Sequence, residues 1–145
     1  MPCPSLYTSD SKMQRSKKII VVEDDPDSLF LICKVLENTG YAVECFQDGS
    51  LLLDSGNYES PSLFILDNKV GLVDGITVCK YLKAQQKSRS VPILMISGSL
   101  EFETIALQAG VDYFLPKPLN MDHLLKIVAS IVTNPSEEIL RPNKD

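Results

Sequence analysis

The sequence predicts a three-layer α/β sandwich, in which helices cover both faces of a five-stranded parallel sheet. Short apolar runs such as residues 18–22 (KIIVV) are typical of strands that are buried on both faces. They alternate along the chain with stretches whose apolar residues recur at helical spacing. This alternation predicts parallel strands joined by right-handed helical crossovers, and a length of 145 residues suits a single domain.

Local signals predict each element of the first half. The β-branched run over 18–22 predicts a strand, after which Asp25 and Pro26 supply an N-cap and a first-turn proline. Gly40 ends the resulting helix. The apolar stripe of that helix consists of Leu29, Ile32, Cys33 and Leu36. The remaining elements are a strand over 41–46, a short helix around 51–53 after the Asp48-Gly49 turn, and a strand over 62–67 that ends at Asp67.

The second half continues the same alternation. A helix begins near Gly75 and turns Ile76, Cys79 and Leu82 inward, and residues 92–96 predict a fourth strand. The last three elements are a helix over 100–109 closed by Gly110, a strand over 111–115, and a helix capped by Asn120 with Leu124, Ile127, Val128 and Ile131 on one face. The order βαβαβαβαβα predicts a doubly wound sheet of the flavodoxin-like (βα)5 type with five helices.

Composition and charge exclude several classes of protein. The chain carries 14 Lys and Arg against 19 Asp and Glu, a net charge of −5, so it lacks the basic surface that binds nucleic acid or anionic lipid directly. No apolar run approaches the roughly 20 residues of a membrane-spanning helix, and residues 1–16 contain no secretory signal. We therefore expect a cytoplasmic protein with no membrane partner. Its parts would be a flexible tail over 1–16, one domain over 17–133, and a tail or the start of a linker over 134–145.

The cysteines form no C-x-x-C pair. These residues are Cys3, Cys33, Cys45 and Cys79, and the single histidine, His123, leaves no Cys/His cluster for zinc. We expect free thiols in a reducing compartment, with Cys33, Cys45 and Cys79 as small core residues.

The carboxyl ends of the predicted strands carry the residues that could perform chemistry. They are Glu23, Asp24 and Asp25 after the first strand, Asp67 at the end of the third, Ser97 after the fourth and Lys117 after the fifth. Doubly wound sheets bind ligands at this edge, so we expect these side chains to converge. Crowded carboxylates repel unless a cation joins them, and Mg²⁺ suits such a set. An aspartate there could attack a phosphoryl group, with Lys117 neutralising its oxygens and Ser97 donating a hydrogen bond.

Each of these residues also has an ordinary structural interpretation. Asp25 is suited to be a helix N-cap, an aspartate at a strand end is often a turn residue, and Ser97 precedes a glycine. Lys117 stands between two prolines and could be an exposed loop lysine. We favour the functional interpretation because the features fall at the ends of four separate strands.

With these residues in view, the sequence resembles the receiver domains of response regulators, which have a CheY-like fold and serve two-component signalling. The resemblance covers about residues 17–133. It rests on the segments VVEDD (21–25), FILD (64–67), VDG (73–75), PILMIS (92–97) and AGVDYFLPKPL (109–119), together with the spacing among them.

The resemblance implies that Asp67 accepts a phosphoryl group whose oxygens Ser97 and Lys117 would bind. It also implies a switch, in which the Ser97 hydroxyl moves toward the phosphoryl group and Phe114 turns inward behind it. Tyr113, the neighbour of Phe114, should face the other side of the strand. The domain would catalyse only its own phosphorylation and dephosphorylation, so we do not expect a turnover enzyme.

The metal ion implied by the resemblance is Mg²⁺. Its ligands would come from Glu23, Asp24 and Asp67, with Asp24 as the direct ligand of the acidic pair, and from the main-chain carbonyl of Lys69. The resemblance also implies a cis peptide bond before Pro118.

The implied partners are a histidine kinase or a histidine phosphotransfer protein as phosphodonor, and a downstream protein or output domain. The signal would leave through residues 100–133, which could also form a homodimer. Few residues follow Thr133, so we expect a stand-alone receiver or a piece of a larger regulator or hybrid kinase.

Other interpretations remain open. The main alternative is a pseudo-receiver, a phosphorylation-independent interaction module, although such modules usually lose the counterpart of Asp67 or Lys117. A flavodoxin-like electron carrier would need hydrogen-bond donors to the flavin phosphate after the first strand, where this chain has Glu-Asp-Asp. A phosphatase or phosphotransferase of small molecules would need a second general acid or a substrate pocket. His123 could be a phosphorelay histidine, but its place in the first turn of the last predicted helix favours an ordinary surface residue.

Overall fold

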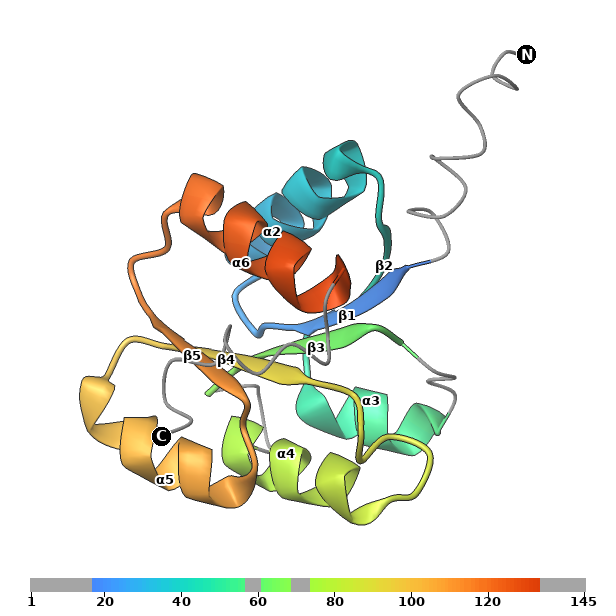
Figure 1. The fold of residues 1–145 in the computed structure, drawn as a ribbon, viewed down its shortest axis with the longest axis vertical. Helices are drawn as coiled ribbons and strands as arrows, with labels where there is room; N and C mark the ends of the chain where they lie inside the picture. Colours follow the sequence, from blue (N-terminus) through green and yellow to red (C-terminus); the bar gives the residue numbers. More distant parts are fainter. Residues whose placement is uncertain (1–16, 57–60, 69–73, 134–145) are drawn as a thin grey trace.

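The predicted strands form one parallel sheet in the order β2-β1-β3-β4-β5 (Figure 1). The computed structural model describes residues 17–56, 61–68 and 74–133, so the predicted tails lie outside the described residues. The strands are β1 (Lys18–Val22), β2 (Ala42–Phe46), β3 (Leu63–Asp67), β4 (Ile93–Ser97) and β5 (Tyr113–Pro116). The doubly wound, flavodoxin-like α/β fold is therefore confirmed.

Helices cover both faces of the sheet. They are α2 (Pro26–Thr39), α3 (Gly49–Ser55), α4 (Gly75–Ala84), α5 (Glu103–Ala109) and α6 (Met121–Thr133), with a 3-10 turn, η1 (Leu100–Phe102), before α5. One core lies between the sheet and α2 with α6, and the other lies between the sheet and α3, α4 and α5 (Figure 1). Within the described residues, none of the helices is long and apolar enough to cross a membrane.

Two helix N-termini use the caps that the sequence predicts. Asp25 Oδ2 accepts a hydrogen bond from the Ser28 amide at 2.9 Å, and Asn120 Oδ1 accepts one from the His123 amide at 3.0 Å. At the other end of α2, Gly40 adopts a φ of 114°, a left-handed conformation that favours glycine. The caps at Asp25 and Asn120 lie where the chain leaves β1 and β5, so they hold the loops at the carboxyl edge of the sheet.

The segment after β4 differs from its prediction. The sequence predicts one helix over 100–109, but its first turn is the 3-10 turn η1, and the α-helical part, α5, has only 7 residues. The Phe102 amide donates to the Ser99 carbonyl at 3.3 Å, three residues earlier, which is the tighter pattern of a 3-10 turn. Gly110 then ends the helix, as predicted, with a φ of 112°.

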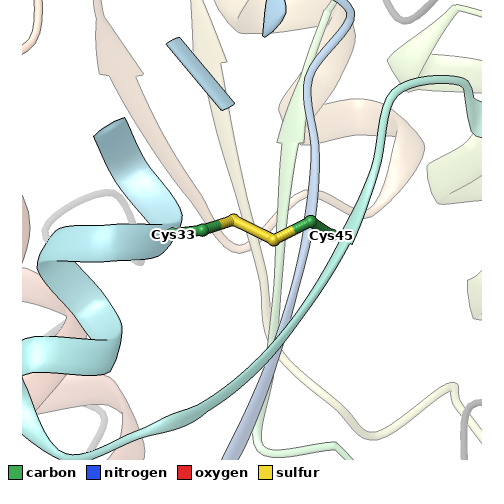
Figure 2. Close-up of a disulfide and its surroundings, with 2 residues drawn as sticks. All are labelled: Cys33 and Cys45. Atoms are coloured by element: carbon green, nitrogen blue, oxygen red, sulfur yellow. A yellow bond between two sulfur atoms is a disulfide. The ribbon is translucent and has the colours of Figure 1, made fainter. Parts of the chain in front are cut away.

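The prediction of free cysteines is wrong for one pair, because a disulfide joins Cys33 of α2 to Cys45 of β2 (Figure 2). Cys45 is also exposed rather than part of the core, since β2 lies at the edge of the sheet and, among the described strands, pairs only with β1. The cysteines are 12 residues apart, and only the placement of α2 beside β2 brings their Cα atoms to 6.9 Å. Cys33 and Cys79 are buried, as predicted, and Cys79 is a free thiol. Cys3 lies outside the described residues.

Candidate functional site

The strand order reverses between β1 and β3, and ligands of doubly wound sheets bind outside the carboxyl ends of the strands at such a point. Strand register determines which side chains meet there. Leu66 pairs with Val22, and Asp67 pairs with Ile96. Glu23, which follows Val22, is therefore level with Asp67, and Ser97 lies one residue beyond the β4 partner of Asp67.

Three carboxylates gather at this edge. Glu23, Asp24 and Asp67 each place one oxygen within 4.8 Å of the oxygens of the other two. Glu23 and Asp67 are buried, with 1% and 6% of their surface exposed, whereas Asp24 is exposed. Carboxylates at this separation repel one another, and a hard dication that prefers oxygen ligands would relieve the repulsion. The donor set is thus chemically suited to Mg²⁺.

Lys117 places a positive charge against two of these carboxylates. Its Nζ lies 3.4 Å from Glu23 Oε1 and 3.4 Å from Asp67 Oδ1. Burial lowers the pKa of Lys117, but attraction to the Asp67 and Glu23 carboxylates outweighs it, so the pKa lies above its ordinary value. The Lys117 amide also donates to the Ser97 carbonyl at 2.8 Å, which ties the loop after β5 to β4. The peptide bond between Lys117 and Pro118 is cis.

Glu23 is a buried carboxyl with a strongly shifted pKa. Burial and the charge of Asp67 raise the pKa of Glu23 from 4.5 to about 7. The Asp25 amide, which donates to Glu23 Oε2 at 3.2 Å, and the charge of Lys117 both favour the ionised form, but they do not cancel the rise. In the absence of a cation, Glu23 is therefore partly protonated near neutral pH.

This shifted pKa predicts how the stability of the metal-free protein depends on pH. Because the pKa of Glu23 is higher in the folded state than in the unfolded state, its contribution to stability is complete below about pH 4.5 and is lost as the pH rises through about 7. In Glu23→Gln the side chain at position 23 cannot titrate, so the free energy of unfolding of this variant should decline less over that range. The measurement is urea unfolding of the wild type and of Glu23→Gln in the presence of a chelator at several pH values. If the free energy of unfolding depended on pH in the same way in both proteins, the raised pKa of Glu23 would be contradicted.

Ser97 and Phe114 lie on the two strands beyond β3. Ser97 is buried, and its Oγ accepts a hydrogen bond from the Ser99 amide at 3.1 Å. Phe114 packs partly buried against the core that includes α3, α4 and α5, whereas Tyr113 belongs to the core under α2 and α6. The two aromatic residues thus face opposite sides of the sheet, as strand alternation predicts.

Gly75, the first residue of α4, lies unusually close to the segment that carries Asp67. Its amide donates to the Asn68 carbonyl at 2.7 Å. A Cβ at position 75 would lie 2.5 Å from the Asp67 carbonyl oxygen and 3.0 Å from the Asn68 Cα. The motif VDG contains this glycine, but the sequence does not show the contact that requires it.

The site opens into a cleft of about 670 Å³. The structure brings six predicted residues to this cleft: Glu23, Asp24, Asp25, Asp67, Ser97 and Lys117. Lining residues that sequence reasoning did not assign to the site include Asn68, Asp74, Ser99, Glu101 and Phe102, and Ile76, which was predicted to turn inward, is partly buried and also lines the cleft. Asn68 and Ser99 lie just beyond the ends of β3 and β4, which is the signal that could have found them, whereas Asp74 is the N-cap of α4. Lys69 lies outside the described residues, and His123 is exposed in the first turn of α6.

Known proteins match most of this chain in sequence. The family model described as "Response regulator receiver domain" matches residues 19–129. The chain is 33% identical over 132 residues to the alkaline phosphatase synthesis transcriptional regulatory protein PhoP of Bacillus subtilis, a match that covers 90% of this chain and 53% of PhoP. It is 29% identical over 117 residues to the DNA-binding dual master transcriptional regulator RpaA of Synechocystis sp., covering 79% of this chain and 48% of RpaA. The chain thus spans about half the length of these curated relatives.

Solved structures share the fold. The signal receiver domain of a signal transduction histidine kinase from Syntrophus aciditrophicus matches with a TM-score of 0.75 and 26% identity, over 83% of this chain and 93% of that chain. The receiver domain of a sensor histidine kinase from Pseudomonas aeruginosa PAO1, solved with a magnesium ion coordinated in its active site cleft, matches with a TM-score of 0.74 and 26% identity. That match covers 81% of this chain and 98% of the Pseudomonas aeruginosa domain.

Proposed function

Because the chain belongs to the family of response regulator receiver domains, we propose that it is a phosphorylatable switch of a two-component system. The observation that carries the proposal is the setting of Asp67. Its buried carboxylate lies 3.4 Å from Lys117 Nζ and within 4.8 Å of two further carboxylates. A nucleophile, a cation for phosphoryl oxygens and an oxygen-rich metal site therefore share one cleft.

In the proposed reaction, an oxygen of Asp67 attacks the phosphorus of a phosphohistidine on a histidine kinase or a histidine phosphotransfer protein. The P–N bond breaks, a P–O bond to Asp67 forms, and the departing imidazole nitrogen takes up a proton. Lys117 and Ser97 would bind the oxygens of the transferred group. Later attack of water on the phosphorus breaks the bond to Asp67, releases inorganic phosphate and restores the carboxylate. The chain would thus catalyse only its own phosphorylation and dephosphorylation.

Glu23, Asp24 and Asp67 would hold the Mg²⁺ that this reaction requires. Asp24 is the exposed member of the set and would be the direct ligand of the acidic pair. Mg²⁺, when bound, would neutralise charge on the carboxylates and on the phosphoryl oxygens. The magnesium ion in the cleft of the Pseudomonas aeruginosa receiver domain supports this assignment.

Phosphorylation would act on the rest of the domain through Ser97 and Phe114. Ser97 Oγ engages the Ser99 backbone in this structure, and a phosphoryl dianion on Asp67 would be a stronger acceptor for the hydroxyl. Movement of Ser97 would favour the arrangement in which Phe114 turns inward. Ser97 precedes the segment 100–133 and Phe114 lies within it, and in this segment Leu100 and Ile105 expose 63% and 49% of their surface. A downstream protein, an output domain or a second copy would bind there.

The names of the relatives point to transcription, but this chain matches only about half of each. We attribute any contact with DNA to an output domain or a partner, because a net charge of −5 does not favour direct binding to DNA.

The proposal is tested with phosphoramidate, a small-molecule phosphodonor, in the presence of Mg²⁺. Intact-mass measurement should show the addition of one phosphoryl group to the wild type and none to Asp67→Asn. Asp54→Asn is the matched control, because Asp54 is exposed and lies on the same tryptic fragment as Asp67, residues 35–69. A chelator should abolish labelling. An unlabelled wild type at saturating Mg²⁺ would contradict the proposal and favour the phosphorylation-independent interaction module.

A further inference from the structure

The Cys33–Cys45 disulfide lines a second hollow in the surface. This hollow is a groove of about 570 Å³ between α2, β2 and α3, and its walls include Phe30, Lys34, Phe46 and Leu51. It shares no lining residue with the cleft beside Asp67. Phe30 and Leu51 expose 68% and 54% of their surface, so the groove is open to solvent. Its volume falls in the range of pockets that admit small molecules.

The two bonded cysteines differ in their access to solvent. Cys45 is exposed on the edge strand β2, whereas Cys33 is 6% exposed and belongs to the core under α2 and α6. Figure 2 shows the bridge running from the helix that carries Cys33 to the strand that carries Cys45. A thiol in the groove would therefore reach the sulfur of Cys45, and the buried Cys33 would be the sulfur released.

We propose that Cys33 and Cys45 form a reversible thiol–disulfide exchange site for low-molecular-weight thiols. A thiolate attacks Cys45 Sγ, which forms a mixed disulfide and releases the Cys33 thiolate to take up a proton. A second thiol then attacks the external sulfur of the mixed disulfide, and Cys45 leaves as a thiolate that is protonated in turn. Two external thiols are oxidised to one disulfide while the protein disulfide is reduced to two thiols. The external disulfide reverses the sequence.

Cys79 provides a contrast within the same chain. Burial raises the pKa of its thiol to about 11, and its Sγ donates to the Ala109 carbonyl at 3.6 Å. The thiolate is the species that exchanges, so a buried thiol of this kind is inert. Cys79 therefore serves as an internal control.

The state of the pair should determine how firmly the edge strand is held. Among the described strands, β2 pairs with β1 alone, and the disulfide adds a covalent connection from β2 to α2. Reduction removes that connection, so amide hydrogen exchange in β2 should become at least about tenfold faster. None of these steps involves Asp67, so the proposal stands independently of phosphorylation.

Peptide mapping tests the exchange directly in a Cys3→Ser background, which removes the N-terminal thiol. Trypsin places Cys33 on residues 19–34, Cys45 on residues 35–69 and Cys79 on residues 70–80. The folded protein is treated with oxidised or reduced glutathione, denatured, alkylated and digested. We expect fragments 19–34 and 35–69 as a linked pair after oxidation and as separate alkylated peptides after reduction. Cys45→Ser should abolish the linked pair, and Cys79→Ser should leave it intact.

Three results would overturn the proposal. One is separate alkylated fragments after oxidation, which would mean that no bridge forms. Another is a linked pair that opens only after denaturation, because the bridge would then be structural and closed to thiols. The third is amide exchange in β2 that does not change on reduction, because β2 would then not depend on the bridge.

Discussion

Lys117→Met is expected to slow phosphoryl transfer to Asp67 by about 100- to 1000-fold, the usual cost of removing one group that stabilises charge on transferring oxygens. Methionine keeps much of the length and apolar bulk of lysine but removes the ammonium. That ammonium lies 3.4 Å from a carboxylate oxygen of Glu23 and 3.4 Å from one of Asp67. Without it, the phosphoryl oxygens would approach two buried carboxylates with less positive charge to offset the repulsion.

The rate is measured by intact mass with phosphoramidate at saturating Mg²⁺. Lys126→Met is the matched control, because Lys126 is exposed on α6 and does not line the cleft. It should react as the wild type does. Since the charge of Lys117 lowers the pKa of Glu23, Lys117→Met should also raise that pKa in the metal-free protein, as followed by carbon-13 NMR. An unchanged rate in a variant with a native circular dichroism spectrum would remove Lys117 from the mechanism.

Gly75→Ala is expected to lower the free energy of unfolding by about 1–3 kcal/mol and to impair phosphorylation as well. The new Cβ would lie 2.5 Å from the Asp67 carbonyl oxygen and 3.0 Å from both the Asn68 Cα and the Met95 Cε. The Met95 methyl group can move aside, but the two backbone atoms cannot move without shifting the segment that carries the acceptor. Stability and activity should therefore fall together.

Gly98→Ala is the matched control for this effect. Gly98 also lines the cleft, but a Cβ there would meet no heavy atom within 4 Å. Its free energy of unfolding should stay within about 0.5 kcal/mol of the wild type. Urea unfolding and phosphoramidate labelling of Gly75→Ala and Gly98→Ala distinguish a steric clash at position 75 from a general effect of adding a methyl group to the cleft. Equal losses in the two alanine variants, or no loss in Gly75→Ala, would contradict the steric explanation.

Most of the fold and much of the candidate site could be predicted from local signals. The strands are short apolar runs, and Asp25, Gly40 and Asn120 mark helix ends through chemistry that involves only neighbouring residues. One topological rule then places the residues at the strand ends on a single edge. The shape of the cleft was not predictable in this way. Glu101 and Phe102, which line it, belong to a 3-10 turn where the sequence predicts an α-helix.

The sequence by itself determined the alternation of strands and helices, the residues at the strand ends and the family, because each depends on spacing within a short stretch of chain. Only the tertiary structure decided three contacts that no signal in the sequence relates. These contacts are the Cys33–Cys45 disulfide, the approach of Gly75 to Asp67, and the ion pair between Lys83 Nζ and Asp112 Oδ2 at 3.0 Å across 29 residues of sequence. Each depends on how a helix packs against the rest of the fold, and no local periodicity or capping signal encodes these contacts.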